Sequence, residues 1–505
     1  MKNILQAFLI SILALSFATE YSLASPEDSM LVQTTSVARF SGRWEEIGRQ
    51  IGLTYPEYIV DFGRIMGFVL LMAGPGHGWN AETYYRTIED KVPHSIKDHL
   101  RGLASGVADV LHLRYETAWH LVLTQNFATE LLNMDNMATI PDALGFRGCT
   151  GFAVTSPAGT FLCHNTDATA SGDNIVVLML WQPTNGDYAY MTMDPPGWAD
   201  VAYGLNEKGI GVTMNAGSPN IDAEIGLPIN FMLRFIMEHA ATLDEAVRYI
   251  EDYIDQGNNF GTGGALVHIV DFNTHEMAKI QVRSRFYETT YGVQSAFGIR
   301  YVASANHYTG QFNPDPDFQY ESSFARYDRL LELIEQTAVF DRDACWNVLS
   351  DTAGGEEGPN TISRIMSSGG TMFGLVMTRE GIQCTMGPPS LYRKKFGEPP
   401  LIRYADLAEH PVASYTAQPL SRQVILSWGL HENAAVSGYK VYRACGQKGS
   451  YALIKELDGD ATQFIDTGLQ NQQRYYYRLE AIGSKGTTMV YGPICATPKL
   501  RYRKR

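Results

Sequence analysis

Several signatures of common protein classes are absent from this 505-residue chain. It has no CxxC or HExxH motif and no other cluster with the spacing of metal ligands, so a structural zinc site is not expected. Beyond the N-terminal region no stretch of about 18 residues is continuously apolar, which argues against a membrane-spanning helix there. Basic residues are in the minority, 40 against 54 acidic, giving a net charge of −14 (40 minus 54). This balance argues against a nucleic acid as the main partner.

Cysteine is also scarce, with six residues in the whole chain. They lie at positions 149, 163, 345, 384, 445 and 495. This is too few for a disulfide scaffold, although an exported protein can carry some bridges. If Cys149 is reserved for chemistry, an odd number remains, so at least one other thiol is expected to be free or paired between chains. Cys163 is expected to be an inert core thiol.

The N-terminus has the three regions of a secretory signal peptide. A basic start at residues 1–3 is followed by an apolar run at 4–17, and the stretch 21–25 ends in small residues that suit a cleavage site. We therefore predict a signal peptide at 1–24 and a secreted or periplasmic protein without stable membrane insertion.

The pattern of the remaining chain predicts an α+β protein. Apolar residues recur at three- and four-residue spacing between about 36 and 135, which indicates a helical leader. After Cys149, short β-branched and aromatic runs separated by turns predict strands. Strands return after two predicted helices, one over 228–241 and one from Thr242 onward. Such an order favours helices layered over antiparallel sheets. We predict a leader at 25–148 and an α+β domain at 149–404.

A second, all-β segment is expected at 415–497, after a linker at 405–414 and before a basic tail at 498–505. Trp428, Leu469, Tyr475, Leu479 and Ala481 fall at intervals that resemble the fibronectin type III signature, with Trp428 in the core and Tyr475 at the tyrosine corner. The resemblance implies a binding or spacing module, with possible contact to a cell surface or a polymer.

Gly148-Cys149-Thr150 is the segment with the clearest chemical potential. Small residues around Cys149 allow close approach to its sulfur, and Gly148 tolerates a strained peptide bond. Cleavage between Gly148 and Cys149 would leave a thiol and an α-amine on one residue, so that nucleophile and base are combined. The alternative is an ordinary buried cysteine acting as a small hydrophobe.

Four downstream residues are candidates to assist Cys149. Asp167 closes the next predicted strand and could hold the amine, while Asn215 and Asn306 end strands and could stabilise an oxyanion. Arg326 begins a helix. Each residue also has an ordinary structural interpretation when it is considered alone. Asp167 could cap a turn, each asparagine could be a turn residue, and Arg326 could be a surface arginine.

Together these features, from Cys149 through the 18-residue step to Asp167 and on to Arg326, resemble the acyl-coenzyme A:isopenicillin-N acyltransferase family. This family is related to the choloylglycine hydrolases and acid ceramidases, and the similarity spans about 36–400. The resemblance implies an αββα N-terminal nucleophile (Ntn) hydrolase that cleaves itself at Gly148–Cys149 and needs no metal or organic cofactor. It further implies that Asp167 orients the amine, that Asn215 and Asn306 bind the oxyanion, and that Arg326 lies near the nucleophile.

One departure concerns His164, which stands where the bile-salt hydrolases place an arginine near the site; we note it as a possible substrate contact. The expected substrate is a small acyl amide, attacked at a non-peptide C–N bond through an acyl-thioester and released by hydrolysis or acyl transfer. Three alternatives stay open: a phospholipase B-like enzyme, a peptidase, or an inactive secreted adhesion protein.

Overall fold

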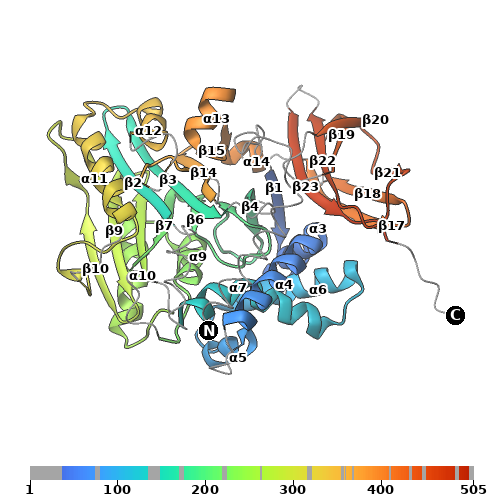
Figure 1. The fold of residues 1–505 in the computed structure, drawn as a ribbon, viewed down its shortest axis with the longest axis horizontal. Helices are drawn as coiled ribbons and strands as arrows, with labels where there is room; N and C mark the ends of the chain where they lie inside the picture. The colour runs from blue at the N-terminus through green and yellow to red at the C-terminus, as the bar shows by residue number, and fades with distance from the viewer. Residues whose placement is uncertain are drawn as a thin grey trace, which may run out of the picture.

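The protein is represented by a computed structural model (Figure 1). It describes residues 37–73, 80–134, 148–169, 176–218, 224–261, 264–315, 321–353, 358, 360–366, 369–408, 411–430, 435–445, 451–483 and 488–499. The expected signal peptide and residues 500–505 of the expected basic tail lie outside these ranges.

The leader is helical, as its periodicity indicated. Its helices are α3 (Trp44–Thr54), α4 (Pro56–Ala73), α5 (Ala81–Ile88), α6 (His94–Leu111) and α7 (Tyr115–Met134). The expectation of helix from residue 36 onward was wrong at its start, because residues 37–42 form strand β1 (Val37–Gly42). Sequence pattern could not reveal this strand, since its partners lie far along the chain in β4 and β23.

Glycines allow α3 and α6 to pack backbone against backbone. A Cβ added at Gly48 would lie 2.1 Å from the His99 carbonyl oxygen, and one at Gly102 would lie 2.0 Å from the Glu45 carbonyl oxygen. Gly52 and Gly106 meet the facing helix in the same way. The run of small residues in α6 thus serves close helix packing.

Two sheets face one another in the central part of the chain. The first contains, in spatial order, β11 (Val293–Gln294), β12 (Arg300–Ser304), β2 (Gly148–Ser156), β3 (Gly159–Thr169), β14 (Gly369–Thr378), β15 (Gly381–Met386) and β16 (Leu401–Arg403), with β13 (Ile365–Met366) paired to β14. The second contains β10 (Phe286–Tyr291), β9 (Glu276–Arg283), β8 (Ala265–Asp271), β7 (Ile210–Ala216), β6 (Tyr203–Asn206), β5 (Tyr190–Asp194) and β4 (Val177–Pro183). β2 and β3 lie against β7.

Helices cover the outer faces of both sheets (Figure 1). They are α11 (Glu321–Gln336) and α12 (Arg342–Leu349) on the first sheet, and α9 (Ile229–His239) and α10 (Leu243–Asp255) on the second. Thr242 caps α10 by accepting a hydrogen bond from the Glu245 amide at 3.2 Å. The order of layers is therefore helix, sheet, sheet and helix, in agreement with the expected α+β sandwich. Shorter elements are η1 (Gly310–Phe312), α13 (Pro389–Phe396) and α14 (Tyr404–Ala408).

The C-terminal segment is an all-β sandwich. One sheet is β17 (Val412–Leu420), β18 (Gln423–Leu430) and β21 (Gln463–Thr467), and the other is β23 (Thr488–Ala496), β22 (Tyr475–Gly483), β19 (Val436–Ala444) and β20 (Ala452–Asp458). Trp428 is buried in its core, and the Tyr475 hydroxyl accepts a hydrogen bond from the Gln470 amide at 3.0 Å. We call residues 412–499 the C-terminal module. The expected linker at 405–414 is largely structured, because it contains most of α14 and the start of β17.

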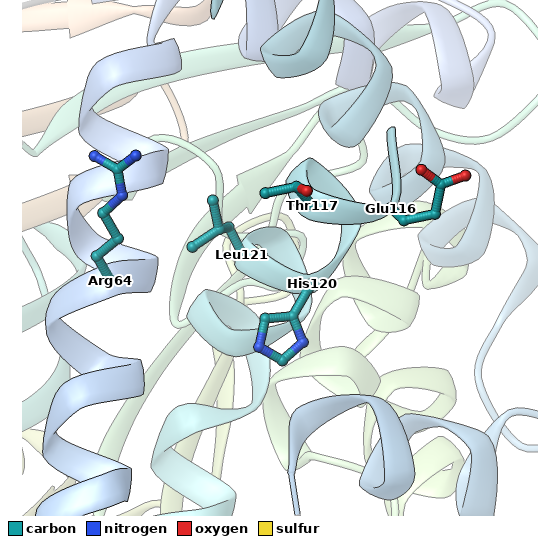
Figure 2. Close-up of a pocket in the computed structure, with 5 residues that line it drawn as sticks. All are labelled: Arg64, Glu116, Thr117, His120 and Leu121. Carbon is teal, nitrogen blue, oxygen red and sulfur yellow. The ribbon is translucent and has the colours of Figure 1, made fainter. Parts of the chain in front are cut away.

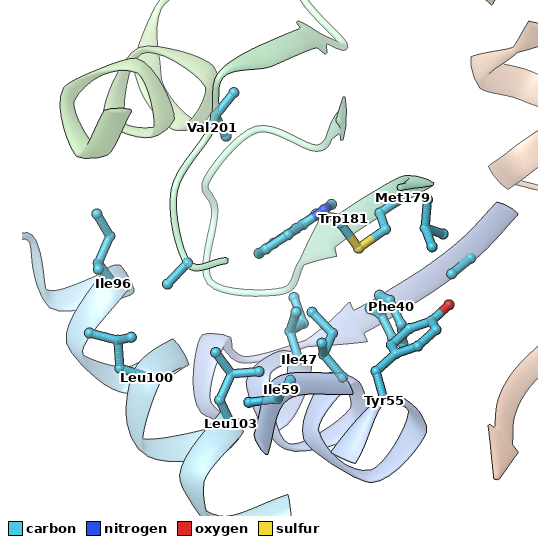
Figure 3. Close-up of a cluster of buried hydrophobic side chains, with 14 of the residues drawn as sticks. Phe40, Ile47, Tyr55, Ile59, Ile96, Leu100, Leu103, Met179, Trp181 and Val201 are labelled. Atoms are coloured by element: carbon cyan, nitrogen blue, oxygen red, sulfur yellow. The ribbon is translucent and has the colours of Figure 1, made fainter. Parts of the chain in front are cut away.

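Strand β1 joins the central domain to the C-terminal module. It pairs in parallel with β4 over six residues and with β23 at Val37–Tyr491, so one sheet of 12 strands runs through both regions. The apolar core is continuous across this junction. Figure 3 shows its leader end, where Ile47, Leu100 and Leu103 lie with Phe40 and Trp181.

Within the residues that the structure describes, no helix combines the length and apolarity that crossing a membrane requires.

Replacement of Gly102 by alanine should lower the free energy of unfolding by about 1–3 kcal/mol, because α3 and α6 would have to separate. Gly67→Ala is a matched control in α4, where the new Cβ would meet only Thr124 Cγ2 at 3.8 Å. That variant should be neutral or slightly more stable, since alanine favours helix. If urea denaturation gives equal losses of unfolding free energy for the two variants, the close-packing interpretation is contradicted.

Candidate active site

The candidate site is built on the hairpin of β2 and β3. The two strands pair in antiparallel register, with Gly148 opposite Asp167 and Cys149 opposite Thr166. Directly after the turn, β3 begins at Gly159 with φ +137°, a backbone conformation that favours glycine. The 18-residue step from Cys149 to Asp167 is therefore the length of one hairpin, and the expectation that Asp167 returns beside Cys149 agrees with this geometry.

Asp167 is held in a buried ion pair. Arg364 Nη1 lies 3.1 Å from Asp167 Oδ2, and the Thr371 hydroxyl donates to Asp167 Oδ1 at 2.8 Å. Both charged side chains are 2% exposed. A Cβ on Gly148 would lie 2.1 Å from Arg364 Nη1 and 2.5 Å from Asp167 Oδ2, so this position accepts only glycine without a shift of the ion pair.

Arg364 was missed by the sequence analysis. It follows Thr361-Ile362-Ser363, a segment with no periodicity or motif that marks a site. The pairing of β14 with β3 brings Thr371 opposite Asp167, and the Arg364 amide donates to the Thr371 hydroxyl at 2.9 Å. Only the sheet register, therefore, identifies this arginine.

Asn306 and Arg326 meet the backbone of Cys149. The Cys149 amide donates to Asn306 Oδ1 at 2.9 Å, and Arg326 Nη2 donates to the same oxygen at 2.8 Å. Arg326 Nη1 donates to the Cys149 carbonyl oxygen and, at 3.1 Å, to the Thr150 hydroxyl. Arg326 is fully buried, unlike the surface arginine of the alternative interpretation.

The orientation of Asn306 differs from that expected for a simple oxyanion donor. Its Nδ2 donates to the Ala216 carbonyl oxygen at 3.0 Å, which occupies one of the two amide hydrogens, while its oxygen faces the Cys149 nitrogen. The backbone amide of Asn306 donates to the Ser323 hydroxyl at 2.7 Å. In this arrangement, Asn306 positions the nitrogen of Cys149.

Burial keeps the Cys149 thiol protonated in the uncleaved chain. Cys149 is 9% exposed. Desolvation, and then the negative charge of Asp167, raise the pKa of this thiol to about 11, although Arg326 and backbone hydrogen bonds from Asp167 and Ala216 lower it. The thiol therefore needs a nearby base before it can act as a nucleophile near neutral pH.

Asn215 lies behind the hairpin, in a buried polar network. Its Nδ2 donates to the carbonyl oxygens of Ser304 at 3.3 Å and Ala305 at 2.7 Å, so both of its amide hydrogens point to backbone. Its Oδ1 lies 3.0 Å from His164 Nε2. Since an amide oxygen only accepts, His164 Nε2 carries the proton. The oxyanion role of Asn215 remains a prediction.

His164 links Asn215 to the strand opposite the cysteine. Its Nδ1 lies 3.1 Å from the Thr166 hydroxyl, and because Nε2 carries the proton, Thr166 is the donor. Burial lowers the pKa of His164 to about 3. The imidazole is completely buried, and both nitrogens have protein partners. Its suggested role as a substrate contact remains a prediction, and this position does not favour it.

Tyr203 is a second residue that sequence did not indicate. Its hydroxyl forms a hydrogen bond with the Thr166 side chain, and its ring centroid lies 4.7 Å from that of His164. Tyr203 thus lies beside the hydrogen bonds that run from Thr166 through His164 to Asn215.

Cys163 lies away from this site. It is fully buried in a separate apolar cluster with Phe152 and Trp346, and its side chain forms a hydrogen bond with Cys345. Burial raises its pKa well above the ordinary value. The prediction of an inert core thiol agrees with these contacts.

A groove of about 380 Å³ lies elsewhere, between α4 and α7 (Figure 2). It is lined by Arg64, Glu116, Thr117, His120 and Leu121. None of the predicted site residues contributes to it. Among the described residues, no group of three or more His, Cys, Asp or Glu side chains is arranged to hold a metal ion.

A family model described as acyl-coenzyme A:6-aminopenicillanic acid acyl-transferase matches residues 154–373. The matched region includes Asp167, Asn306 and Arg364, whereas Cys149 lies just before it. The match supports a relation of this region to Ntn-type hydrolases and acyltransferases in general.

Other similarities are weaker. A mutant conjugated bile acid hydrolase from Clostridium perfringens is 12% identical, with 47% of this chain and 89% of that chain covered at a TM-score of 0.30. An Fn3-like protein from Clostridium thermocellum is 24% identical, with 18% and 91% covered at a TM-score of 0.15. An amylopullulanase from Thermoanaerobacter thermohydrosulfuricus is 26% identical over 95 residues, 18% of this chain, and the chain spans 6% of its length.

Removal of Arg364 should strongly destabilise the protein. Arg364→Gln leaves the buried Asp167 carboxylate without its ion pair, a change that typically costs about 3–5 kcal/mol. The control Arg403→Gln breaks a contact of 3.9 Å with Glu380 in which both side chains are more than half exposed, and it should cost less than about 1 kcal/mol. Urea denaturation measures both; a loss below about 1 kcal/mol for Arg364→Gln would contradict the importance of the pair.

His164 should make stability depend on acid pH. Its pKa is about 3 when folded, against an ordinary 6.5, so the unfolded chain binds the proton first. The contribution of neutral His164 is complete above pH 6.5 and is lost as the pH falls towards 3. Between these values the wild type should lose up to about 1.4 kcal/mol per pH unit more than His164→Gln. If the unfolding free energies of the two proteins depend on pH in the same way, His164 is not the source of the acid dependence.

Proposed function

We propose that the chain is a self-cleaving, N-terminal-cysteine amidohydrolase or acyltransferase that acts on a non-peptide C–N amide bond. The observation that carries this proposal is the position of Cys149. Its nitrogen contacts the Asn306 amide oxygen, and Gly148 is packed against the Asp167–Arg364 ion pair. The family match to residues 154–373 supports the same reaction class for the region that supplies these partners.

In the proposed maturation, the Cys149 thiol attacks the carbonyl carbon of Gly148. The thiol proton passes to the Cys149 nitrogen, which leaves as an amine. Water then hydrolyses the resulting thioester, which frees the Gly148 carboxylate and the thiol. A residue larger than Gly148 would displace Arg364 beside the proposed scissile bond. The products are a small chain that ends at Gly148 and a large chain that begins at Cys149.

Cleavage would change the chemistry of the thiol. The new α-amine has an ordinary pKa of about 8, so it can accept the thiol proton near neutral pH. Asn306 Oδ1 would then hold an amine hydrogen at the place where it now accepts the Cys149 amide. The negative charge of Asp167 lies close enough to act on the thiol, and it would favour the protonated amine.

In the proposed turnover, the thiolate attacks the substrate carbonyl, and the leaving amine takes the proton from the Cys149 ammonium. Water, or a second amine, then attacks the acyl-thioester and restores the thiol. Backbone amides and the second Nδ2 hydrogen of Asn306 are the proposed oxyanion donors. Asn215 could join them only by releasing the Ser304 and Ala305 carbonyl oxygens. Export of the enzyme through residues 1–24 and contact of the C-terminal module with a surface or polymer also remain proposals.

Cys149→Ala should stay a single chain and show no amide hydrolysis, because the substitution removes the nucleophile of both reactions. Intact mass and N-terminal sequencing of the wild type should give two chains meeting at Gly148 and Cys149. Cys163→Ala is the matched control, because this thiol lies away from the site, in the apolar cluster of Phe152 and Trp346. This variant should be cleaved like the wild type.

A panel of N-acyl amides, lactams, phospholipids and peptides, tested with and without an added amine, distinguishes the possible reactions. Turnover of acyl amides would support the proposal. Full activity in uncleaved wild type would contradict maturation at Cys149. Turnover of phospholipids or peptides alone would assign another reaction to the same cysteine, and no turnover with an uncleaved chain would favour a binding protein.

A further inference from the structure

The C-terminal module contacts the leader through a strand, an ion-pair cluster and an apolar core. β1 is flanked by β4 on one side and β23 on the other. Under the proposed cleavage at Gly148–Cys149, β1 would belong to the small chain, and both flanking strands to the large chain. The small chain would thus be held between two parts of the large one.

The ion-pair cluster forms between α4 and the module. Glu57 and Asp61 are one helical turn apart on α4. Arg474 Nε lies 3.5 Å from Glu57 Oε2, and Arg474 Nη2 donates to Asp61 Oδ2. The Thr497 amide and hydroxyl donate to the two Glu57 oxygens at 3.2 and 2.9 Å. The module therefore provides these bonds to both carboxylates.

Burial makes this contact more than a surface ion pair. The Glu57 side chain is 8% exposed, and a carboxylate this buried requires charged or hydrogen-bonding partners. Arg474 is 30% exposed and binds Glu57 and Asp61 together. Beneath them, the apolar core runs without interruption from Tyr55 and Ile59 of the leader to Tyr415 and Tyr491 of the module.

These contacts do not fit an arm that moves freely on a linker, because mobile domains generally share smaller and more polar interfaces. We propose that the C-terminal module is an intramolecular clamp whose partner is the leader, and that it retains the small chain after cleavage. The retention step rests on the proposed function, whereas the clamp itself does not. The role assigned to the module is thus internal binding.

The test is amide hydrogen exchange on the full chain. Arg474→Ala removes the module's ion pairs with Glu57 and Asp61, and Asp61→Asn weakens the same contact from the leader. Both should speed exchange in peptides covering 37–42 and the first turns of α4, by about tenfold or more for Arg474→Ala. Lys455→Ala is the matched control, because Lys455 is an exposed cation on β20, at the far edge of the same sheet.

Exchange in β2 and β3 reports on the central domain and should stay unchanged. If residues 37–42 exchange at the wild-type rate in both Arg474→Ala and Asp61→Asn, the clamp is overturned. An equal rise in β2 and β3 would also overturn it, since the contact would then support the whole fold rather than the leader.

Intact mass of the same samples separates the clamp from the proposed function. If the chain is cleaved, Arg474→Ala should release the small chain at a lower urea concentration than the wild type or Lys455→Ala, as measured by size exclusion. Release at the same urea concentration would overturn retention. If the chain is uncleaved, the proposed function fails, and hydrogen exchange still decides whether the clamp exists.

Discussion

The register of the β2–β3 hairpin is the constraint on which the candidate site depends. It sets Gly148 against Asp167 and Cys149 against Thr166, and a slip by one residue would turn each side chain to the other face of the sheet. Because Asp167 is fixed by Arg364 and Thr371, the same register places a buried ion pair directly against Gly148. A buried charged pair is thereby brought beside Cys149, whose backbone also contacts Asn306 and Arg326.

The buried surroundings of Cys149 explain why cleavage and catalysis would be coupled. Desolvation favours the neutral thiol, so the intact chain holds a weak nucleophile, and a new amine on the same residue would supply the missing base. The polar network of Tyr203, Thr166, His164 and Asn215 behind the hairpin is satisfied within the protein, and a neutral His164 suits this network. This polar network would therefore keep the site ordered, whereas proton transfer would take place at the Cys149 amine.

Strand β1 connects regions that the sequence presents as three units. A leader, a central domain and a C-terminal module were expected as successive segments, yet one apolar cluster and one 12-stranded sheet include residues of all three. A cut between Gly148 and Cys149 would leave this sheet intact, because β1 is hydrogen-bonded to strands on the other side of the cut. The module then completes the sheet beside the leader, in addition to any contact with an outside partner.

The sequence by itself determined the local elements and the chemistry of single residues. Helical periodicity predicted the leader, β-branched and aromatic runs between turns predicted the strands after Cys149, and the step to Asp167 equals one hairpin. Tertiary structure alone decided what depends on contacts between distant segments. The pairing of β14 with β3 identified Arg364, the turn of Asn306 directed its oxygen to the Cys149 nitrogen, and β1 became a strand because β4 and β23 satisfy its backbone. Local periodicity does not reveal such partners, because each contact joins segments that are far apart in the sequence.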